Sequence, residues 1–292
     1  MPISATWRDA AWNGSVFCAV GYSGAAATSP DGITWTQQTL PYAANCTGIV
    51  WNGTLFCVST TEVTSQNKSI LTSSDGITWD IRASVSAQTW IDIALKGTLA
   101  CVIENLGQWA ATSIDGINWS GTYTLPVSTY WADIACNGSV FCVIKGTSAS
   151  TVAATSADGV TWVSRTLPVS VVWSKIAANN YIFCAISGDS DVCAISQDGI
   201  TWMQGSLPAI SGAWQDIGWN GELFFITSSN NKFASSPDGL TWTLGDLPVS
   251  GTWLCISGNN SIVLLISSTQ AAVSNDYSRF WTNFHSQTEL IT

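Results

Sequence analysis

Four pairs of a tryptophan and an aspartate have the residue types and the spacing that could bind a sugar ring. The members of each pair stand two residues apart, and on a regular β-strand such residues point to the same face. An aromatic plane beside a carboxylate offers apolar stacking for the ring and acceptors for its hydroxyl groups. The pairs are Trp7–Asp9, Trp90–Asp92, Trp131–Asp133 and Trp214–Asp216. They predict ligand-binding sites, of which the first is weaker because Arg8 could pair with Asp9.

Packing between neighbouring units offers an alternative for the same residues. Trp173 and Trp253 occupy the tryptophan position without an aspartate, and Cys46 with Gly48 replaces the pair in a further copy. In this alternative the tryptophans are wedges between units, and each aspartate accepts a hydrogen bond from a neighbouring backbone. The sugar interpretation gains from the repetition, because several weak sites on one molecule bind with avidity. The sequence leaves both interpretations open.

Residues for catalysis or metal binding are sparse. The single histidine, His285, has no serine or cysteine nucleophile arranged around it, and Asp189 with Asp191 is more typical of a solvated loop than of a calcium site. The four arginines lie in unrelated positions: Arg8, Arg82, Arg165 and Arg279. The sequence therefore predicts no catalytic residue, no metal and no cofactor. Glycoside hydrolysis by two carboxylates is the weakest alternative, because no pair among the 19 acidic residues stands out.

A short turn, S-x-D-G-x-T-W, recurs along the whole chain. Six copies are intact, as in SPDGITW at 29–35, and a degenerate copy, SNDYSRFW, stands at 274–281. The turn aspartates are 44, 40, 43, 40, 40 and 38 residues apart, a period typical of propellers, solenoids and arrays. We assign the turn to stability: the aspartate accepts hydrogen bonds from its own turn, the glycine takes a positive φ, and the tryptophan fills the gap between units. The intact copies are Asp31 with Trp35, Asp75 with Trp79, Asp115 with Trp119, Asp158 with Trp162, Asp198 with Trp202, and Asp238 with Trp242.

Each repeat reads as four short antiparallel strands. Asn-Gly between two apolar runs, as at Asn13-Gly14, is a strong hairpin signal, and the Asp-Gly turn makes a second hairpin. The second strand is apolar on both faces and the fourth alternates, which predicts a buried centre and an exposed outer strand. We therefore expect an all-β chain, a single seven-bladed β-propeller over residues 1–292, closed by packing and by its two tails. The expected blades are 2–41, 42–84, 85–126, 127–168, 169–208, 209–248 and 249–292.

The repeated turn resembles the Asp-box of sialidases and other Asp-box (BNR-like) propellers, with one residue fewer between the Asp and the Gly. This resemblance implies a propeller whose boxes face away from the ligand side, while the arginine triad of sialidases is missing. The longer repeat, L-P-x-S-x-x-W followed by N-G, F-C and the box, resembles those of phage tail-associated proteins. We therefore expect a non-enzymatic tail or fibre component of a virion that docks on host glycans. The alternatives are a soluble lectin and a purely architectural virion protein.

Composition and cysteine positions fit this expectation. The net charge is −10 with only nine lysines and arginines, so no basic groove for nucleic acid is expected. No secretory signal and no apolar run long enough to insert into a membrane is evident. Five of the nine cysteines (Cys18, Cys57, Cys101, Cys142 and Cys184) share one apolar position of the repeat, which predicts free core thiols and no disulfide. We expect a virion protein assembled in the host cytoplasm, with other virion proteins or a host surface glycan as partners.

Overall fold

The computed structural model describes residues 1–61, 70–82, 89–247, 251–259, 262–274 and 282–284. Within them the chain is almost entirely β-structure, with one short 3-10 helix, η1 (Tyr22–Gly24). The all-β prediction is therefore confirmed. Residues 275–281 of the degenerate box, with Asp276 and Arg279, lie outside the described residues, as does His285.

The strands of the described residues form six antiparallel sheets, and within each sheet the neighbours follow one another in sequence. The first two sheets are β1 (Trp7–Trp12), β2 (Phe17–Gly21), β3 (Ala25–Ser29) and β4 (Thr36–Thr39), then β5 (Cys46–Trp51), β6 (Phe56–Thr60), β7 (Ile70–Ser73) and β8 (Asp80–Arg82). The last three are β16 (Trp173–Ala178), β17 (Phe183–Ser187), β18 (Val192–Ser196) and β19 (Met203–Ser206); β20 (Trp214–Trp219), β21 (Phe224–Ser228), β22 (Lys232–Ser236) and β23 (Thr243–Asp246); and β24 (Trp253–Asn259), β25 (Ile262–Ser267), β26 (Ala271–Ser274) and β27 (Thr282–Phe284).

The remaining sheet has seven strands because one long strand belongs to two meanders. Its strands are β9 (Trp90–Lys96), β10 (Leu99–Glu104), β11 (Leu106–Ser113), β12 (Ser120–Cys136), β13 (Phe141–Lys145), β14 (Ser150–Ser156) and β15 (Val163–Val171). The first part of β12 pairs with β11 up to Tyr130, and the part from Trp131 to Cys136 pairs with β13.

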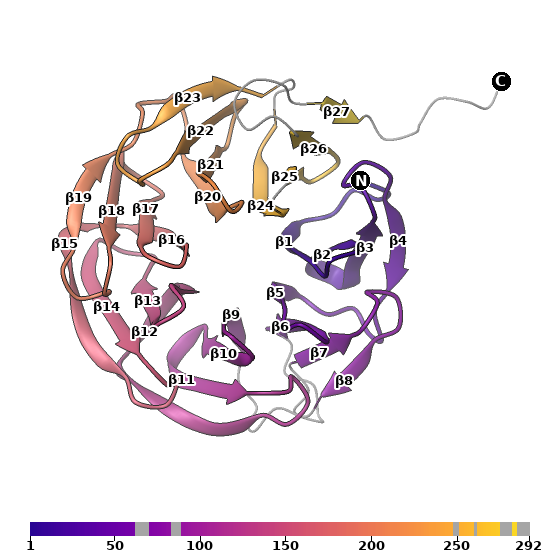
Figure 1. Cartoon of the computed structure of the whole chain (residues 1–292), viewed down its shortest axis with the longest axis horizontal. Coiled ribbons are helices and arrows are strands. Elements are labelled where there is room, and N and C mark those ends of the chain that lie inside the picture. The colour runs from indigo at the N-terminus through magenta and orange to yellow at the C-terminus, as the bar shows by residue number, and fades with distance from the viewer. Residues whose placement is uncertain (62–69, 83–88, 248–250, 260–261, 275–281, 285–292) are drawn as a thin grey trace.

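The sheets stand side by side around a common centre (Figure 1). The strand nearest the centre is the first of each meander: β1, β5, β9, the second part of β12, β16, β20 and β24. We call these the inner strands and number their positions from the first residue, so that position 1 is Trp7 in β1 and Trp131 in β12. The second strand of each meander is buried along almost its whole length, which confirms the predicted apolar centre.

The repeated turn has the hydrogen bonds expected from its sequence. In the third copy Asp115 Oδ1 accepts the backbone N–H groups of Ile117 and Asn118 at 2.8 and 2.7 Å and the hydroxyl of Ser113 at 2.9 Å. The glycines have φ between 70° and 76°, the left-handed region that favours glycine. All six tryptophans donate their indole N–H to the carbonyl of that glycine. The aspartate and glycine roles are therefore confirmed.

Burial of the six box tryptophans is only partly as predicted. Trp79, Trp119 and Trp162 are buried, whereas Trp35, Trp202 and Trp242 are half-buried. The closer contact between repeats is made by the box glycine: a Cβ on Gly76 would lie 2.8 Å from Thr28 Cγ2 of the preceding repeat. The turn therefore joins neighbouring repeats through its backbone as much as through its indole.

The cysteines are core residues. All nine fall within the described part of the chain, none is in a disulfide, and eight are buried, Cys136 being half-buried. Burial raises the pKa of the Cys193 thiol to about 11 and that of Cys57 to about 12. A thiol that is both buried and protonated is a small hydrophobe, as the apolar position predicted.

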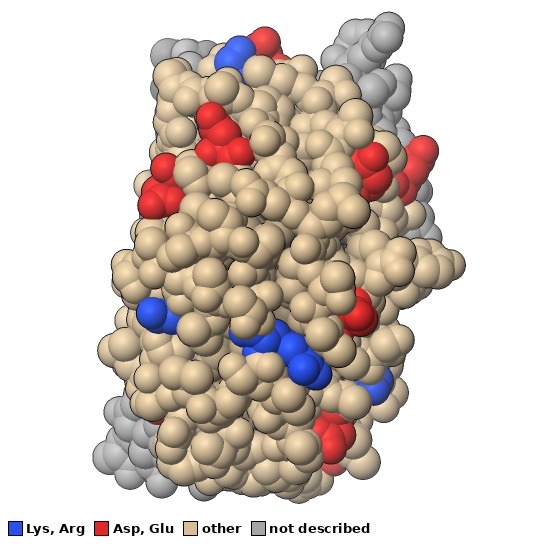
Figure 2. Space-filling model, turned by 90° about the vertical axis from the view of Figure 1, so that its left-hand side faces the viewer, with Lys and Arg blue, Asp and Glu red and all other residues tan. Residues whose placement is uncertain are grey.

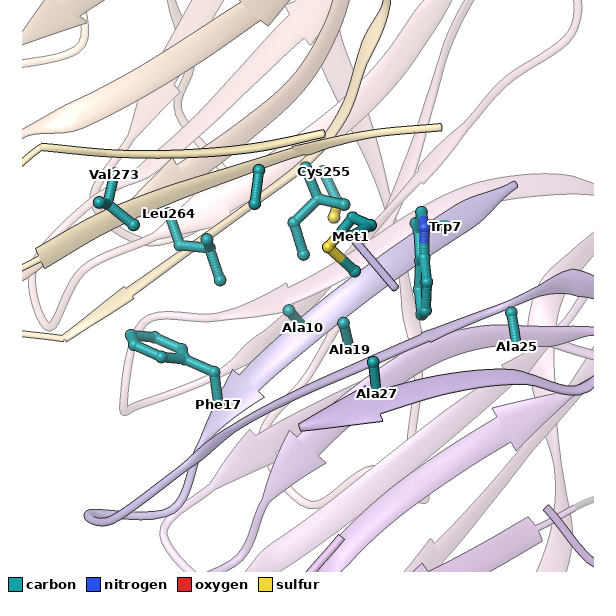
Figure 3. Close-up of a cluster of buried hydrophobic side chains, with 12 residues drawn as sticks. Met1, Trp7, Ala10, Phe17, Ala19, Ala25, Ala27, Cys255, Leu264 and Val273 are labelled. Carbon is teal, nitrogen blue, oxygen red and sulfur yellow. The ribbon is translucent and has the colours of Figure 1, made fainter. Parts of the chain in front are cut away.

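The N-terminal segment joins the two ends of the ring. Met1, Trp7 and Phe17 pack against Cys255, Leu264 and Val273 in one cluster (Figure 3). The amino group of Met1 donates to the carbonyl of Thr269 at 3.2 Å, and the N–H of Ala5 donates to that of Ser268 at 2.9 Å. The predicted closure by packing and by the first tail is confirmed, and the second tail lies outside the described residues.

The outer surface carries few charges. On the side of the ring that includes β15 and β19, scattered acidic and basic side chains interrupt a largely neutral surface (Figure 2). Among the described residues, no helix is long and apolar enough to cross a membrane.

Candidate functional site

The predicted sugar-binding pairs lie on the inner strands, but their tryptophans are not available for stacking. The side chains of Trp7 and Trp131 are 0% exposed, that of Trp90 1% and that of Trp214 3%. Trp131 packs with Cys101 and Ile103 of the preceding repeat and with Phe141 of its own. In this arrangement no indole face is open to a sugar, and the tryptophans wedge adjoining repeats apart.

The premise that the two members of a pair share a face fails because of a β-bulge. Every inner strand shifts register between positions 1 and 3, for example between Trp131 and Asp133. A bulge places two residues opposite one and so breaks the two-residue period of a strand. As a result Trp131 packs against the preceding repeat, whereas Asp133 points toward the following one.

The four aspartates link neighbouring repeats through the backbone. Asp133 Oδ2 accepts the N–H of Ile176 at 2.8 Å, and Asp216 Oδ2 accepts that of Ile256 at 2.8 Å. Asp9 bonds to Ile49 in the same way at 2.9 Å, and Asp92 to Ile134 at 3.3 Å. These are the bonds that the packing alternative predicts. Each joins an inner strand to the next inner strand along the chain.

A single lysine stands among these carboxylates. Lys175 occupies position 3 of β16, where four other inner strands have aspartate, and its Nζ lies 3.8 Å from Asp133 Oδ1 and 3.7 Å from Asp216 Oδ1. Burial lowers its pKa, but the charges of Asp133, Asp216 and Asp92 outweigh this effect and hold the pKa above its ordinary value. Lys175 therefore stays an ammonium.

The carboxylates outnumber the cations around them. Burial raises the pKa of Asp9 to about 7 and that of Asp216 to about 6, and it also raises the pKa values of Asp92 and Asp133. The two neighbouring carboxyl groups Asp92 and Asp133 also act on each other, and this interaction lowers the pKa of Asp92 and raises that of Asp133. We call Asp9, Asp92, Asp133, Asp216 and Lys175 the acidic network.

Arg8 directly precedes Asp9 in β1, but its guanidinium does not form an ion pair with the Asp9 carboxylate. Its guanidinium stands over the ring of Tyr22, 5.2 Å from the centroid, and its buried Nε has no acceptor among the described residues. Arg8 and Lys175 both line a small cavity of about 180 Å³ at the end of the ring where the inner strands begin.

A larger cavity forms a cup at the opposite end, where the inner strands end. It has a volume of about 730 Å³ and is lined by Trp12, Trp51, Trp219, Leu95 and residues of β24. A second cavity of about 400 Å³ shares Trp219 and Gly258 with it, and its wall includes Asn179, Asn180 and Asn220. We call the two together the tryptophan cup. Its lining combines three tryptophans with small residues and asparagines.

The cup tryptophans are held by their neighbours. Trp12, Trp51 and Trp219 are half-buried at position 6 of their strands, and each ring packs against the first phenylalanine of the next strand. The centroid distances are 4.5 Å to Phe17, 4.9 Å to Phe56 and 4.7 Å to Phe224. Half-buried indoles fixed in this way offer apolar surface to a ligand at little cost in conformational entropy.

The predicted site and the cup lie at opposite ends of the inner strands. The hairpins beside the cup contact the box turns, since Asn137 Nδ2 donates to the carbonyl of Gln197 at 2.8 Å. A signal for the cup was present in the sequence, because Trp12, Trp51 and Trp219 each stand directly before an Asn-Gly turn. Asp189, one of the two candidate calcium ligands, accepts the hydroxyl of Ser187, and the described residues include no group of three potential metal ligands.

Consecutive four-stranded meanders around a common centre, with every inner strand facing that centre, define a β-propeller. Residues 129–288 match a family model described as the DUF6242 beta propeller domain, which is more than half of the chain. The chain belongs to this family of β-propellers.

Solved structures with the same fold share little sequence with this chain. A streptogramin B lyase is 10% identical with a TM-score of 0.78, and the match covers 97% of this chain and 95% of that chain. YCF48 bound to D1 peptide is 15% identical with a TM-score of 0.72, covering 100% and 96%. Virginiamycin B lyase from Staphylococcus aureus is 10% identical with a TM-score of 0.77, covering 91% and 92%. Among curated proteins none matches this chain by sequence.

Proposed function

We propose that this chain is a non-enzymatic binding module and that it holds a sugar of a host-surface glycan in the tryptophan cup. The observation that carries the proposal is the composition of the cup wall. Half-buried indoles offer stacking surface, and the amides of Asn179, Asn180 and Asn220 in the wall around Trp219 offer polar groups. This is the mixture that a ring with one apolar face and several hydroxyl groups requires.

The size of the cup supports a small ligand or one residue of a larger one. Its two parts, of about 730 and 400 Å³, are comparable to ligand pockets of roughly 300–1,000 Å³. Asn220 is fixed in this wall, because its Oδ1 accepts the N–H groups of Glu222 and Leu223.

The finer features of the fold belong to the same proposal. We count seven blades, because β12 is one strand shared by two meanders that pair with different partners. We also interpret the repeated turn as a shortened Asp-box, since its aspartate and tryptophan make the same local bonds in all six intact copies.

A virion tail or fibre remains the predicted location. Its support is the likeness of the repeats to phage tail-associated proteins, together with a sequence in which only 10% of residues are charged. Other virion proteins are the predicted structural partners. The alternatives are a soluble lectin with the same cup and an architectural virion protein without a ligand, and a glycosidase stays the weakest.

A peptide is the second candidate ligand. One structure with this fold is described as YCF48 bound to D1 peptide. An aromatic cup with asparagines along its wall would also accept an apolar side chain and the amides of a peptide backbone.

The test is a glycan array followed by calorimetry on the best binder, with the wild type, Trp51→Ala and Trp109→Ala. Trp51 lines the cup, whereas Trp109 is a half-buried tryptophan on β11, two strands away from the inner strand. We expect Trp51→Ala to weaken binding by roughly tenfold or more, equal to about 1.4 kcal/mol, and Trp109→Ala to leave it unchanged.

Thermal melting of each variant separates lost binding from lost folding. Equal glycan affinity in the wild type and in a folded Trp51→Ala variant would remove the cup from the proposal. Release of reducing sugar from a bound glycan would instead favour the glycosidase, and an array without any binder would favour the architectural protein.

A further inference from the structure

The walls of the tryptophan cup carry no charged side chain among the residues that line it. Aromatic walls without a competing cation are a setting in which an organic ammonium binds, because the negative face of an indole attracts positive charge. Three indoles in one cavity provide several such faces. The lining of the cup is therefore suited to an organic cation.

The acidic network lies on the same inner strands as this cup, closer to their first residues. Its members occupy position 3 of the inner strands and the cup tryptophans position 6, so about 10 Å of strand separates them. Charges in low-dielectric surroundings act over such a distance more strongly than they do in water. The cup is thus an aromatic cavity without charged lining residues, on the same strands as a group of carboxylates.

The groups at position 3 can be followed around the whole ring. They are Asp9 on β1, Gly48 on β5, Asp92 on β9, Asp133 on β12, Lys175 on β16, Asp216 on β20 and Cys255 on β24. Arg8 on β1 is the other cation close to them, because its charge adds to the repulsion on Lys175. The network and Arg8 together therefore have four carboxyl groups and two cations. Both cations, Arg8 and Lys175, line the small cavity at the end of the ring where the inner strands begin.

We propose that the ligand group held deepest in the tryptophan cup is an organic ammonium, supplied by an amino sugar or by a lysine side chain. This inference rests on the proposed function and specifies its ligand. A buried carboxyl group without a counterion keeps its proton, and a cation above it favours the ionised form. Binding is therefore coupled to proton release, and affinity for an ammonium rises with pH through the range in which Asp9 and Asp216 titrate.

The first experiment compares choline, whose charge does not depend on pH, with its neutral isostere 3,3-dimethylbutan-1-ol. Calorimetry is done on the full chain at about pH 8 and about pH 5, on either side of the raised pKa values. We expect choline to bind about tenfold more tightly than the isostere at the higher pH, with release of protons, and to lose most of this advantage at the lower pH. Equal affinities, or an advantage that does not change with pH, would overturn the proposal.

A matched pair of charge variants tests the source of the effect. Asp9→Asn removes a carboxylate of the network and keeps an acceptor for the N–H of Ile49. Asp246→Asn removes one formal charge on the outer strand β23, where Asp246 is paired with Lys232. The advantage of choline should fall about threefold in Asp9→Asn and stay unchanged in Asp246→Asn. The same loss in both variants would show that overall charge, and not the network, is responsible.

The source of the ammonium is settled by two further comparisons. Glucosamine oligomers are tested against their N-acetylated counterparts, and a lysine peptide against its acetyl-lysine form. A preference for the free amine in the first comparison identifies an amino sugar, and a preference in the second alone identifies a peptide. If N-acetylated or neutral sugars bind as well as the amines and binding still depends on Trp51, the glycan function stands and the ammonium inference fails.

Discussion

Replacement of Trp131 by alanine should lower the stability of the protein and leave its ligand affinity unchanged. Trp131 is fully buried between two repeats, in a cluster that includes Cys101, Ile103 and Phe141. Truncation of a buried tryptophan to alanine typically costs about 3–5 kcal/mol, because the lost contacts are compounded by the cavity left behind. At about 2–4 °C per kcal/mol for large domains, the melting temperature should fall by on the order of 10 °C.

Phenylalanine variants sharpen this prediction. Trp131 and Trp173 occupy equivalent positions in the repeat, but only the indole N–H of Trp173 has hydrogen-bond acceptors among the described residues. Trp173 Nε1 has the carbonyls of Ser150 and Val169 at 3.1 and 3.3 Å, whereas Trp131 Nε1 has no acceptor among the described residues. Trp173→Phe leaves the carbonyls of Ser150 and Val169 without this donor, while Trp131→Phe removes a donor that has no acceptor among the described residues. We therefore expect Trp173→Phe to cost about 1 kcal/mol more than Trp131→Phe.

Urea denaturation followed by intrinsic fluorescence measures these differences, and calorimetry on the folded fraction measures binding. The wedge interpretation requires lower stability and unchanged affinity in Trp131→Ala. A loss of less than about 1 kcal/mol together with lost ligand binding would contradict it and would restore the start of the inner strand as the binding site.

Three further predictions concern the turn, the acidic network and the thiols. Gly76→Ala should destabilise the protein by about 1–3 kcal/mol more than Gly53→Ala in urea titrations. Both glycines have positive φ, but only at Gly76 would the new Cβ meet a neighbour, Thr28 Cγ2 at 2.8 Å. Equal losses of stability would mean that packing of the turn against the preceding repeat contributes nothing. Because the folded-state pKa of Asp9 is raised to about 7, the folded chain holds a proton that the unfolded chain releases, and the free energy of unfolding should fall as the pH rises from about 5 to about 7, above the range in which the box aspartates with their lowered pKa values add stability. Melting temperatures measured across that range should show the fall, with a smaller slope in Asp9→Asn, and a steady rise with pH would contradict the assignment. Thiol titration should find nine thiols after denaturation without reductant and far slower reaction in the folded protein, because eight of the nine are buried; five or fewer after denaturation would indicate disulfides.

The sequence by itself determined the features that depend on neighbouring residues. The box turn is complete within seven residues, so the hydrogen bonds of its aspartate and the positive φ of its glycine could be predicted from their types and order, whereas the burial of its tryptophan depends on the neighbouring repeat. The shared position of Cys18, Cys57 and Cys101 indicated a core site, because it lies in a strand that is apolar on both faces. Period and hairpin signals were enough to predict an all-β ring of repeats, since each signal spans only a few residues.

Only the tertiary structure decided which way the inner strands face. The bulge between positions 1 and 3 turns Trp131 toward the preceding repeat and Asp133 toward the following one, so a two-residue period gave the wrong face. The contact of Asp133 with Ile176 joins residues 43 positions apart, which no local pattern reveals. Likewise Trp12, Trp51 and Trp219 have a visible sequence signal before Asn-Gly, but they form one cup only because closure of the ring brings position 6 of several distant strands to the same end.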